Sequence, residues 1–239
     1  MNDVNLPTVK ERTLKNSANT FFQKYKHGLL LLYFLIYFPW FRWLEQSVTN
    51  RFHIIHMTID DFIPFIEYFI VPYLLWFAYV AAAFVYFLFK NKEEFYRLCV
   101  FLFVGMTVFL IISTVYPNGH YLRPTVFERD NIFVDMVRLL YQADTPTNLF
   151  PSIHVYNSIG VNIAVWHCED FKQKKWLHIG SFVLMISIIL STMFLKQHSV
   201  FDVITGIVFA VFMYPLVYSK NTVRIGASKA SLADRARRV

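Results

Sequence analysis

The chain has 239 residues and a formal net charge of +7; 56% of its residues are hydrophobic and only 16% are charged. Soluble domains are usually about 45–50% apolar and about 25% charged, so this composition excludes an ordinary soluble protein and predicts a polytopic membrane protein. The basic residues stand in short tracts between apolar segments, which indicates membrane topology and gives no reason to expect nucleic acid as a partner.

Six apolar segments follow one another, each close to the roughly 20 residues that a membrane-spanning helix needs. We expect spans at about 29–44, 64–89, 98–116, 152–168, 176–195 and 200–218. They predict one all-α bundle of six transmembrane helices, residues 29–218, between a basic N-terminal segment, 1–28, and a basic tail, 219–239. The first span lacks a cleavage site of small residues, so we interpret it as a retained signal anchor.

Two connecting segments are long and polar. Apolar residues recur at helical spacing between Ile132 and Leu140, within the connection 117–150, and predict a short helix on the membrane or over a site. The connection 46–63 contains four residues of metal-ligating type, His53, His56, Asp60 and Asp61. A metal site there is a weak alternative, because nothing else in the sequence demands a metal.

The two cysteines, Cys99 and Cys168, are too few for a disulfide framework, and we expect neither a disulfide nor a zinc site.

Positive charge predicts which side of the membrane each connection faces. Basic tracts occur in the N-terminal segment, at 90–97, at 172–175 and in the tail, and six spans place all four on one side. By the positive-inside rule this side is cytoplasmic, so we expect both termini there and the protein in the cell (plasma) membrane. The segments 46–63, 117–150 and 196–199 then face the opposite, non-cytoplasmic side.

A histidine and a carboxylate stand near the start of the last span. His198 and Asp202 are four residues apart and share one face of a helix, where the carboxylate would fix the tautomer of the histidine. A second histidine, His154, stands at the start of the fourth span. Ionisable groups at the edge of apolar spans are costly and usually functional. Two histidines on one face could divide nucleophilic attack and proton transfer between them.

Three further residues on the same predicted face suit a phosphate. Arg123 offers a planar fork of donors, and Lys196 offers a compact cation. Ser152 follows Pro151 at the expected start of a helix, where free N–H groups bind anions. Such a site needs no metal or other cofactor, because the cations and the helix start supply the electrostatics.

Each of these residues has a simpler interpretation when taken singly. Arg123 and Lys196 could be interfacial anchors, Ser152 could be only a helix cap, and each histidine could be a buried, hydrogen-bonded side chain. Asp202 is harder to explain in this way, because a carboxylate one turn inside a span needs a partner. The joint pattern favours a functional site.

The same stretches resemble a known family. Leu122-Arg123-Pro124, Pro151-Ser152-Ile153-His154 and the run from Ser191 to Asp202 are similar, in order and spacing, to three signature motifs of the type 2 phosphatidic acid phosphatase superfamily, which also contains vanadium haloperoxidases. The resemblance covers roughly residues 64–218, with the motifs within 116–202. It implies a six-helix, phosphatase-like membrane domain with its active site at the non-cytoplasmic face.

The resemblance also implies a role for each motif residue. His198 would be the nucleophile that forms a phosphohistidine, and Asp202 would orient it. His154 would protonate the leaving group. Arg123 and Ser152 would bind phosphate oxygens.

Three positions depart from the family pattern. The lysine usual seven residues before the motif arginine is Tyr116, the glycine usual before the second-motif histidine is Ile153, and the arginine usual after the third-motif serine is Thr192. Two phosphate-binding cations are therefore missing, and Lys196 could compensate for one. The changes resemble the branch that includes inositol phosphorylceramide synthases and sphingomyelin synthases, which transfer a phospho-headgroup between lipids.

We therefore predict an integral membrane lipid phosphatase that hydrolyses a lipid phosphate monoester or diphosphate without a metal. A lipid phospho-headgroup transferase is the first alternative, because a bound alcohol could replace water as the acceptor. A non-catalytic transporter or scaffold is the second, with the histidines and Asp202 lining a polar path. A haloperoxidase-like vanadate binder is disfavoured, because those enzymes are mostly soluble.

Overall fold

The computed structural model describes residues 23–48 and 51–219, so the predictions for 1–22 and for the tail from 220 lie outside the described residues. The α-helices are α2 (Phe34–Ser47), α3 (Ile70–Lys90), α4 (Lys92–Val115), α5 (Ile132–Ala143), α6 (Ile153–His167), α7 (Lys175–Phe194) and α8 (Val200–Tyr218). The 3-10 helices are η1 (Lys26–Tyr33), η2 (Thr58–Phe62), η3 (Glu67–Phe69) and η4 (Glu169–Phe171). Two short parallel strands, β1 (His53–Ile54) and β2 (Asn118–Gly119), complete the fold. The predicted all-α membrane architecture is confirmed.

Five helical segments are long and apolar enough to cross a bilayer. They are Gln23–Ser47, Glu67–Lys90, Lys92–Val115, Lys175–Phe194 and Val200–Tyr218. The sixth expected span, α6, has only 15 residues, about 22 Å at 1.5 Å per residue, which is short of the roughly 30 Å of a hydrocarbon core. It begins late because Pro151 disfavours helical backbone at Phe150 and Ser152 is extended. Six full-length spans are thus not found among the described residues.

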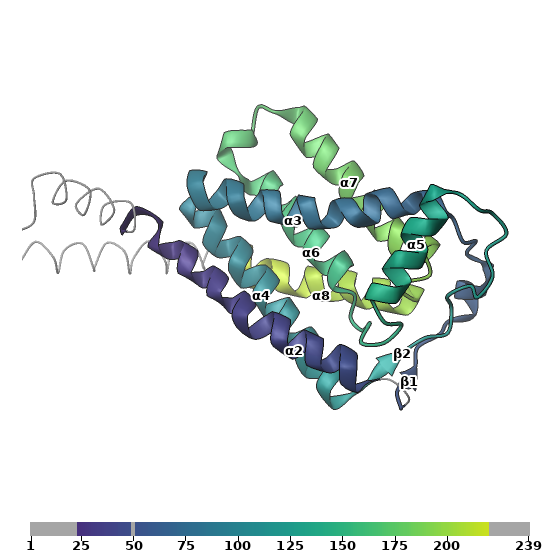
Figure 1. Cartoon of the computed structure of the whole chain (residues 1–239). Helices are drawn as coiled ribbons and strands as arrows, with labels where there is room; N and C mark the ends of the chain where they lie inside the picture. The colour runs from purple at the N-terminus through teal and green to yellow at the C-terminus, as the bar shows by residue number, and fades with distance from the viewer. Residues whose placement is uncertain (1–22, 49–50, 220–239) are drawn as a thin grey trace, which may run out of the picture.

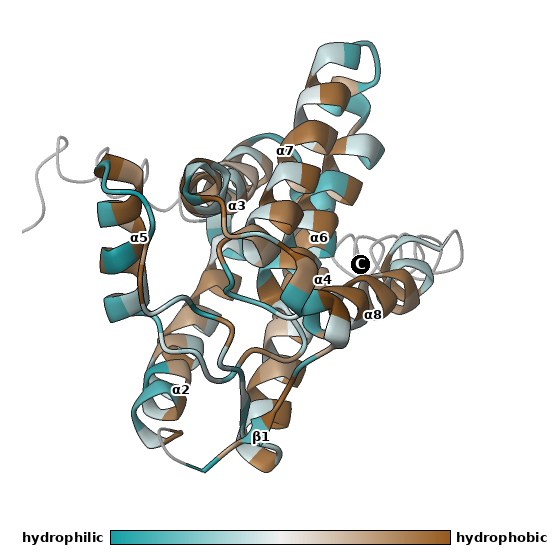
Figure 2. Ribbon diagram, turned by 90° about the vertical axis from the view of Figure 1, so that its right-hand side faces the viewer, coloured by the Kyte–Doolittle hydropathy of each residue, from teal (hydrophilic) through white to brown (hydrophobic). Residues whose placement is uncertain are grey.

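The connections sort to two ends of the bundle. The strands, α5 and the segments that join them gather at one end, and the α3–α4 and α6–α7 turns lie toward the other (Figure 1). The basic tracts at 90–97 and 172–175 belong to these two turns. Part of the first tract is helix, because the side chain of Asn91 accepts the Glu94 N–H at 3.1 Å and caps α4. Hydrophobic residues dominate α8, whereas α5 carries a broad hydrophilic face (Figure 2).

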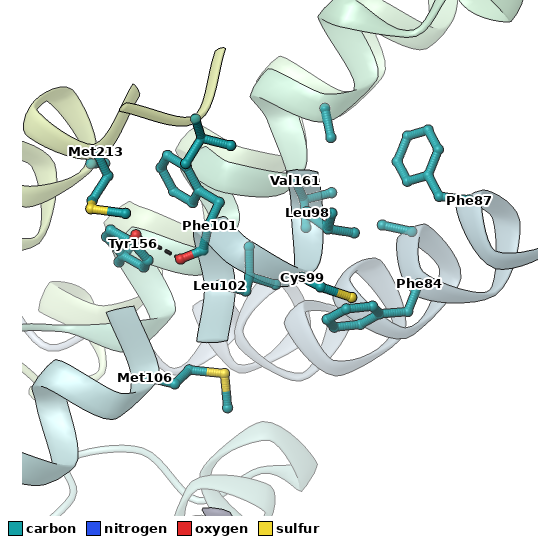
Figure 3. Packing of buried hydrophobic residues seen from close by; sticks show 14 of the residues in the cluster. Phe84, Phe87, Leu98, Cys99, Phe101, Leu102, Met106, Tyr156, Val161 and Met213 are labelled. Atoms are coloured by element: carbon teal, nitrogen blue, oxygen red, sulfur yellow. Dashed lines mark hydrogen bonds between the residues drawn. The ribbon is translucent and has the colours of Figure 1, made fainter. Parts of the chain in front are cut away.

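Helix α6 lies in the centre of the bundle and packs closely on α4. Gly105 permits this approach, because a Cβ there would lie 2.0 Å from the Cε1 atom of Tyr156. The Tyr156 ring stacks on Phe101, and its hydroxyl donates to the Phe101 carbonyl at 2.8 Å (Figure 3). Small residues at such crossings are typical of helix pairs in membranes. The core therefore fixes the helix whose first turn carries His154.

The helix predicted within 117–150 is confirmed as α5. Asn131 begins it by accepting the N–H groups of Phe133 and Val134 at 3.0 and 3.1 Å. Its buried Val137 belongs to a cluster with Ile70, Tyr73 and Leu195, which come from α3 and the end of α7. Helix α5 is thus anchored at the end of the bundle that holds the predicted site.

Candidate active site

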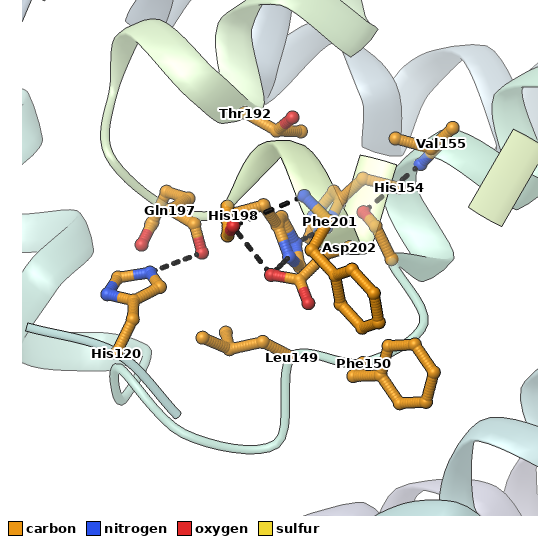
Figure 4. Close-up of polar contacts among 12 residues, drawn as sticks. His120, Leu149, Phe150, His154, Val155, Thr192, Gln197, His198, Phe201 and Asp202 are labelled. Atoms are coloured by element: carbon orange, nitrogen blue, oxygen red, sulfur yellow. Dashed lines mark hydrogen bonds and ion pairs between the residues drawn. The ribbon is translucent and has the colours of Figure 1, made fainter. Parts of the chain in front are cut away.

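The two predicted catalytic histidines and their predicted carboxylate lie together at one end of the bundle (Figure 4). Nε2 of His198 lies 3.4 Å from Nδ1 of His154, although the two residues are 44 positions apart in the chain. Nδ1 of His198 lies 3.5 Å from Oδ2 of Asp202. The structure therefore brings together the second and third motif stretches, as the topology permitted.

Two helix starts position these groups. Ser152 is the N-cap of α6 and accepts the Val155 N–H at 3.4 Å, so His154 stands in the first turn of that helix. Ser199 is the N-cap of α8, and its own N–H donates to Oδ2 of Asp202 at 3.0 Å. A helix start of this kind favours an anion at α6, whereas at the start of α8 the Val200 and Phe201 N–H groups already donate to Asp60 and to the Ser199 hydroxyl.

His198 is held as a neutral imidazole. Its side chain is only 6% exposed, and burial together with the positive charge of Arg123 lowers the pKa of His198 to about 3. The carboxylate near Nδ1 places the ring proton there, which leaves the Nε2 lone pair free to attack. The 3.5 Å separation from Asp202 is longer than a good hydrogen bond, and such contacts often tighten when substrate binds.

Aromatic side chains of α3 enclose His154. Its ring centroid lies 4.8 Å from that of Tyr73 and 4.4 Å from that of Trp76. These rings limit the access of water to the histidine from the α3 side. Nothing in the sequence pattern distinguished Tyr73 or Trp76 from the many other aromatic residues of the spans.

Arg123 lies beside the histidines, but its guanidinium already has protein partners. Nη1 donates to the Asp144 carbonyl at 2.7 Å, and Nη2 donates to the Thr145 carbonyl at 3.1 Å and to the side chain of Gln197. Burial lowers its pKa, yet a guanidinium stays protonated in proteins. Nε of Arg123 is buried without a hydrogen-bond partner in the described part of the chain. A phosphate would use Nε or compete with Gln197.

Gln197 and His120 were missed by the sequence analysis. His120 is fully buried, with Nε2 3.0 Å from the Gln197 carbonyl, and its Nδ1 accepts the Leu122 N–H at 3.2 Å. These contacts join the first motif to the turn that carries His198. No sequence pattern predicts a role for His120. For Gln197 the sequence offers one indication, which is that it directly precedes His198.

Lys196 points to a different neighbour. Its ammonium donates to the carbonyl of Asp60 at 2.7 Å, and its backbone is left-handed, with φ of 51°. A role for Lys196 in phosphate binding therefore stays a prediction, and it requires the ammonium to leave this carbonyl.

The four residues of metal-ligating type in 46–63 do not converge in the described structure. The ring of His53 stacks on Tyr116 at 4.1 Å, His56 pairs with Asp61 at 2.9 Å, and Asp60 faces the start of α8. These side chains diverge, and among the described residues no three His, Cys, Asp or Glu side chains gather as ligands. Cys99 and Cys168 are both free and buried.

The two positions at which the family pattern has cations, 116 and 192, hold uncharged residues in this chain. Thr192 is buried, and its carbonyl accepts the N–H groups of Gln197 and His198 at 2.8 and 3.0 Å. Tyr116 is 45% exposed and forms the stack with His53. The Thr192 hydroxyl donates to the Ile189 carbonyl at 2.7 Å within α7. Neither position adds positive charge.

The fold and the site together define a class: an all-α integral membrane protein with a His–His–Asp group at one end of its helices, in which His198 and Asp202 are buried. The model of the PAP2 superfamily matches residues 122–225, a segment that contains Arg123, Ser152, both histidines and Asp202. The resemblance to this superfamily is therefore confirmed for that segment, and it supports a lipid function of the phosphatase or phosphotransferase type. The match is to the superfamily as a whole, so the likeness to the synthase branch stays a prediction. No curated protein and no solved structure shows a significant match to the chain.

Proposed function

We propose that this protein is a membrane lipid phosphatase that works through a phosphohistidine on His198. The observation that carries the proposal is the buried His198, with Asp202 near Nδ1 and His154 3.4 Å from Nε2. In the proposed first step Nε2 attacks phosphorus and the bond from phosphorus to the ester oxygen breaks. His154, in the imidazolium form that a bound phosphate anion favours, gives a proton to that oxygen.

In the second step water takes the place of the leaving alcohol. His154, now without the transferred proton, accepts one from the water as its oxygen attacks phosphorus. The bond between phosphorus and Nε2 breaks, and His198 returns to the neutral form. Arg123 and the N–H groups at the start of α6 are proposed to hold the phosphate oxygens through both steps.

The substrate we propose is a lipid phosphate monoester or diphosphate. Support comes from the position of the cluster at an end of apolar helices, where a headgroup would meet it while the hydrocarbon tail stays in the bilayer. We further propose that this end faces the non-cytoplasmic side of the plasma membrane, with both termini cytoplasmic. Labelling a cysteine introduced at exposed Glu128 by a membrane-impermeant reagent on intact cells tests the orientation.

The deciding experiment is phosphate release from phosphatidic acid and from a long-chain isoprenyl diphosphate by the purified protein in EDTA. His198→Ala is compared with His167→Ala, which removes a histidine at the far end of α6. We expect release by the wild type and by His167→Ala, and none by His198→Ala. Absence of release by the folded wild type would exclude a simple phosphatase.

A headgroup transferase is the second candidate. It is favoured by one observation: Tyr116 and Thr192 stand where two phosphate-binding cations are usual. The same preparation, given a phospholipid donor and a lipid alcohol acceptor, would then form a new phospholipid in a reaction that also requires His198.

A further inference from the structure

Asp60 lies far from the motifs in sequence but is buried against the start of α8. It belongs to η2 and is only 1% exposed. Its Oδ2 accepts the Ser199 hydroxyl at 2.6 Å and the Met57 N–H at 2.8 Å, and its Oδ1 accepts the Val200 N–H at 2.8 Å. The carboxylate thus binds the two residues that directly follow His198.

The backbone of Asp60 binds Lys196, which lies two residues before the histidine. Its carbonyl accepts the Lys196 ammonium at 2.7 Å. Lys196 has the left-handed backbone of the turn, which costs free energy for a residue with a side chain and persists where the surroundings hold it. Asp60 therefore contacts the turn on both sides of His198, across 136 to 140 positions of sequence.

A short series of contacts leads from Asp60 to the histidine. Asp60 holds the Ser199 hydroxyl, the Ser199 N–H donates to Oδ2 of Asp202 at 3.0 Å, and the same oxygen lies 3.5 Å from Nδ1 of His198. A shift of Ser199 would therefore move Asp202 relative to the ring. An error of about 1 Å in such a group can cost about 100-fold in rate.

We infer that Asp60 is a positioning residue, which fixes the Lys196–Val200 turn so that Asp202 orients His198 for attack. The inference rests on the proposed role of His198 as nucleophile. It assigns a function in the reaction to a segment outside the matched residues 122–225. It also gives Lys196 a structural contact with Asp60 in place of its predicted contact with phosphate.

The two carboxylate oxygens of Asp60 accept three hydrogen bonds, which explains why a carboxylate is needed at this position. An amide in place of Asp60 has one acceptor oxygen and an NH₂ group. If the NH₂ replaced Oδ2 it would oppose the Met57 N–H, and if it replaced Oδ1 it would oppose the Val200 N–H. The start of α8 also favours a negative charge at this point.

The test compares Asp60→Asn with Asp61→Asn. Asp61 is the matched control, because its side chain is 59% exposed and pairs with the half-exposed His56. We expect Asp60→Asn to lower kcat at least 10-fold while KM stays within 2-fold of the wild type. Asp61→Asn should leave both constants within 2-fold. Hydrogen exchange should accelerate in residues 196–203 of Asp60→Asn, and the other helices should keep their wild-type protection.

Two results would overturn the inference. One is a kcat for Asp60→Asn equal to that of Asp61→Asn; the other is faster exchange throughout the protein, which would mean a general structural role. If the wild type has no activity on any donor, the proposed function fails, yet the exchange measurement still tests whether Asp60 holds the turn.

A second variant tests the inference independently, in case Asp60→Asn does not fold. Ser199→Ala removes one hydroxyl of the series and should reproduce the lower kcat and the local exchange, at smaller amplitude. The combined variant should be no worse than Asp60→Asn alone, because both changes act on the same series of contacts. Normal kcat and exchange in Ser199→Ala would reject the series of contacts.

Discussion

The rings of His198 and His154 are in contact, yet the proposed mechanism needs one to attack phosphorus and the other to transfer a proton. Nδ1 of His198 faces Asp202, which leaves its Nε2 as an acceptor toward Nδ1 of His154 at 3.4 Å. The proton between the two rings is therefore bonded to Nδ1 of His154, which donates to Nε2 of His198. The two residues thus differ in their roles because a carboxylate stands behind only one of them.

This assignment predicts a dependence on the leaving group. A lipid alkoxide needs a proton, whereas p-nitrophenolate leaves without one, so His154→Gln should slow the lipid substrate about 10²–10⁴-fold and p-nitrophenyl phosphate far less. Initial rates with the two substrates measure this difference. His198→Ala serves as the control and should abolish both reactions. An equal loss on both substrates in His154→Gln would contradict proton donation by His154.

Arg123 is proposed to bind phosphate and also donates to the carbonyls of Asp144 and Thr145, so its replacement should affect both substrate binding and stability. Lysine keeps the charge but loses the fork, so Arg123→Lys should raise KM several-fold and lower stability by about 1–3 kcal/mol. The control is Arg138→Lys, whose ion pairs with Asp130 and Asp135 are exposed. Its effect on unfolding in detergent should be below about 1 kcal/mol. Equal effects of the two changes would remove Arg123 from the site.

At the scale of elements, the position of α6 decides where His154 stands. The helix is short and is located by its contact with α4, in which Gly105 faces the buried Tyr156 ring. That ring is stacked on Phe101 and hydrogen-bonded to it, so it cannot move aside without breaking both contacts. The geometry of the site therefore depends on a glycine that is remote from it.

Gly105→Ala should therefore destabilise the protein. The added Cβ would lie 2.0 Å from the tyrosine ring, and overpacking of this kind costs about 1–3 kcal/mol. Gly180→Ala on α7 is the matched control, because its Cβ would meet no atom within 4 Å. Thermal unfolding in one detergent should show a lower Tm for Gly105→Ala and an unchanged or higher Tm for Gly180→Ala. A similar Tm for both would mean that α4 and α6 separate easily.

At the scale of the whole molecule, hydropathy and helical spacing suffice to predict the helices, because a bilayer demands apolar surface along each span. The expected fourth span, 152–168, matches α6 within one residue at each end, yet α6 is too short for a full span. The sequence predicted that the motif residues lie on the same side of the membrane. It did not predict that they contact one another. The contacts of Asp60 with Lys196 and of Arg123 with Gln197 are tertiary, so no local pattern reveals them.

The pH dependence of stability is also a property of the whole fold, because it sums over all groups whose pKa changes on folding. Burial lowers the pKa of His120 from 6.5 to about 4, with a hydrogen bond to the Gln197 carbonyl acting against this shift. The folded state then binds fewer protons than the unfolded state between these values, so stability falls as the pH drops from 6.5 to 4. Asp144 acts in the opposite direction, because burial and the charge of Glu45 raise its pKa to about 7.

His120→Gln isolates the histidine contribution and leaves that of Asp144 in place. The amide of Gln can keep the bond to the Gln197 carbonyl but does not titrate. Between pH 6.5 and 4 the free energy of unfolding should decrease less in the variant than in the wild type, by up to about 3 kcal/mol. The Tm measured across this range in detergent would vary less with pH than that of the wild type. His167→Gln, at the C-terminal end of α6, is the control for replacing a histidine away from the His198 turn. An unchanged slope in His120→Gln would mean that folding does not lower the pKa of His120.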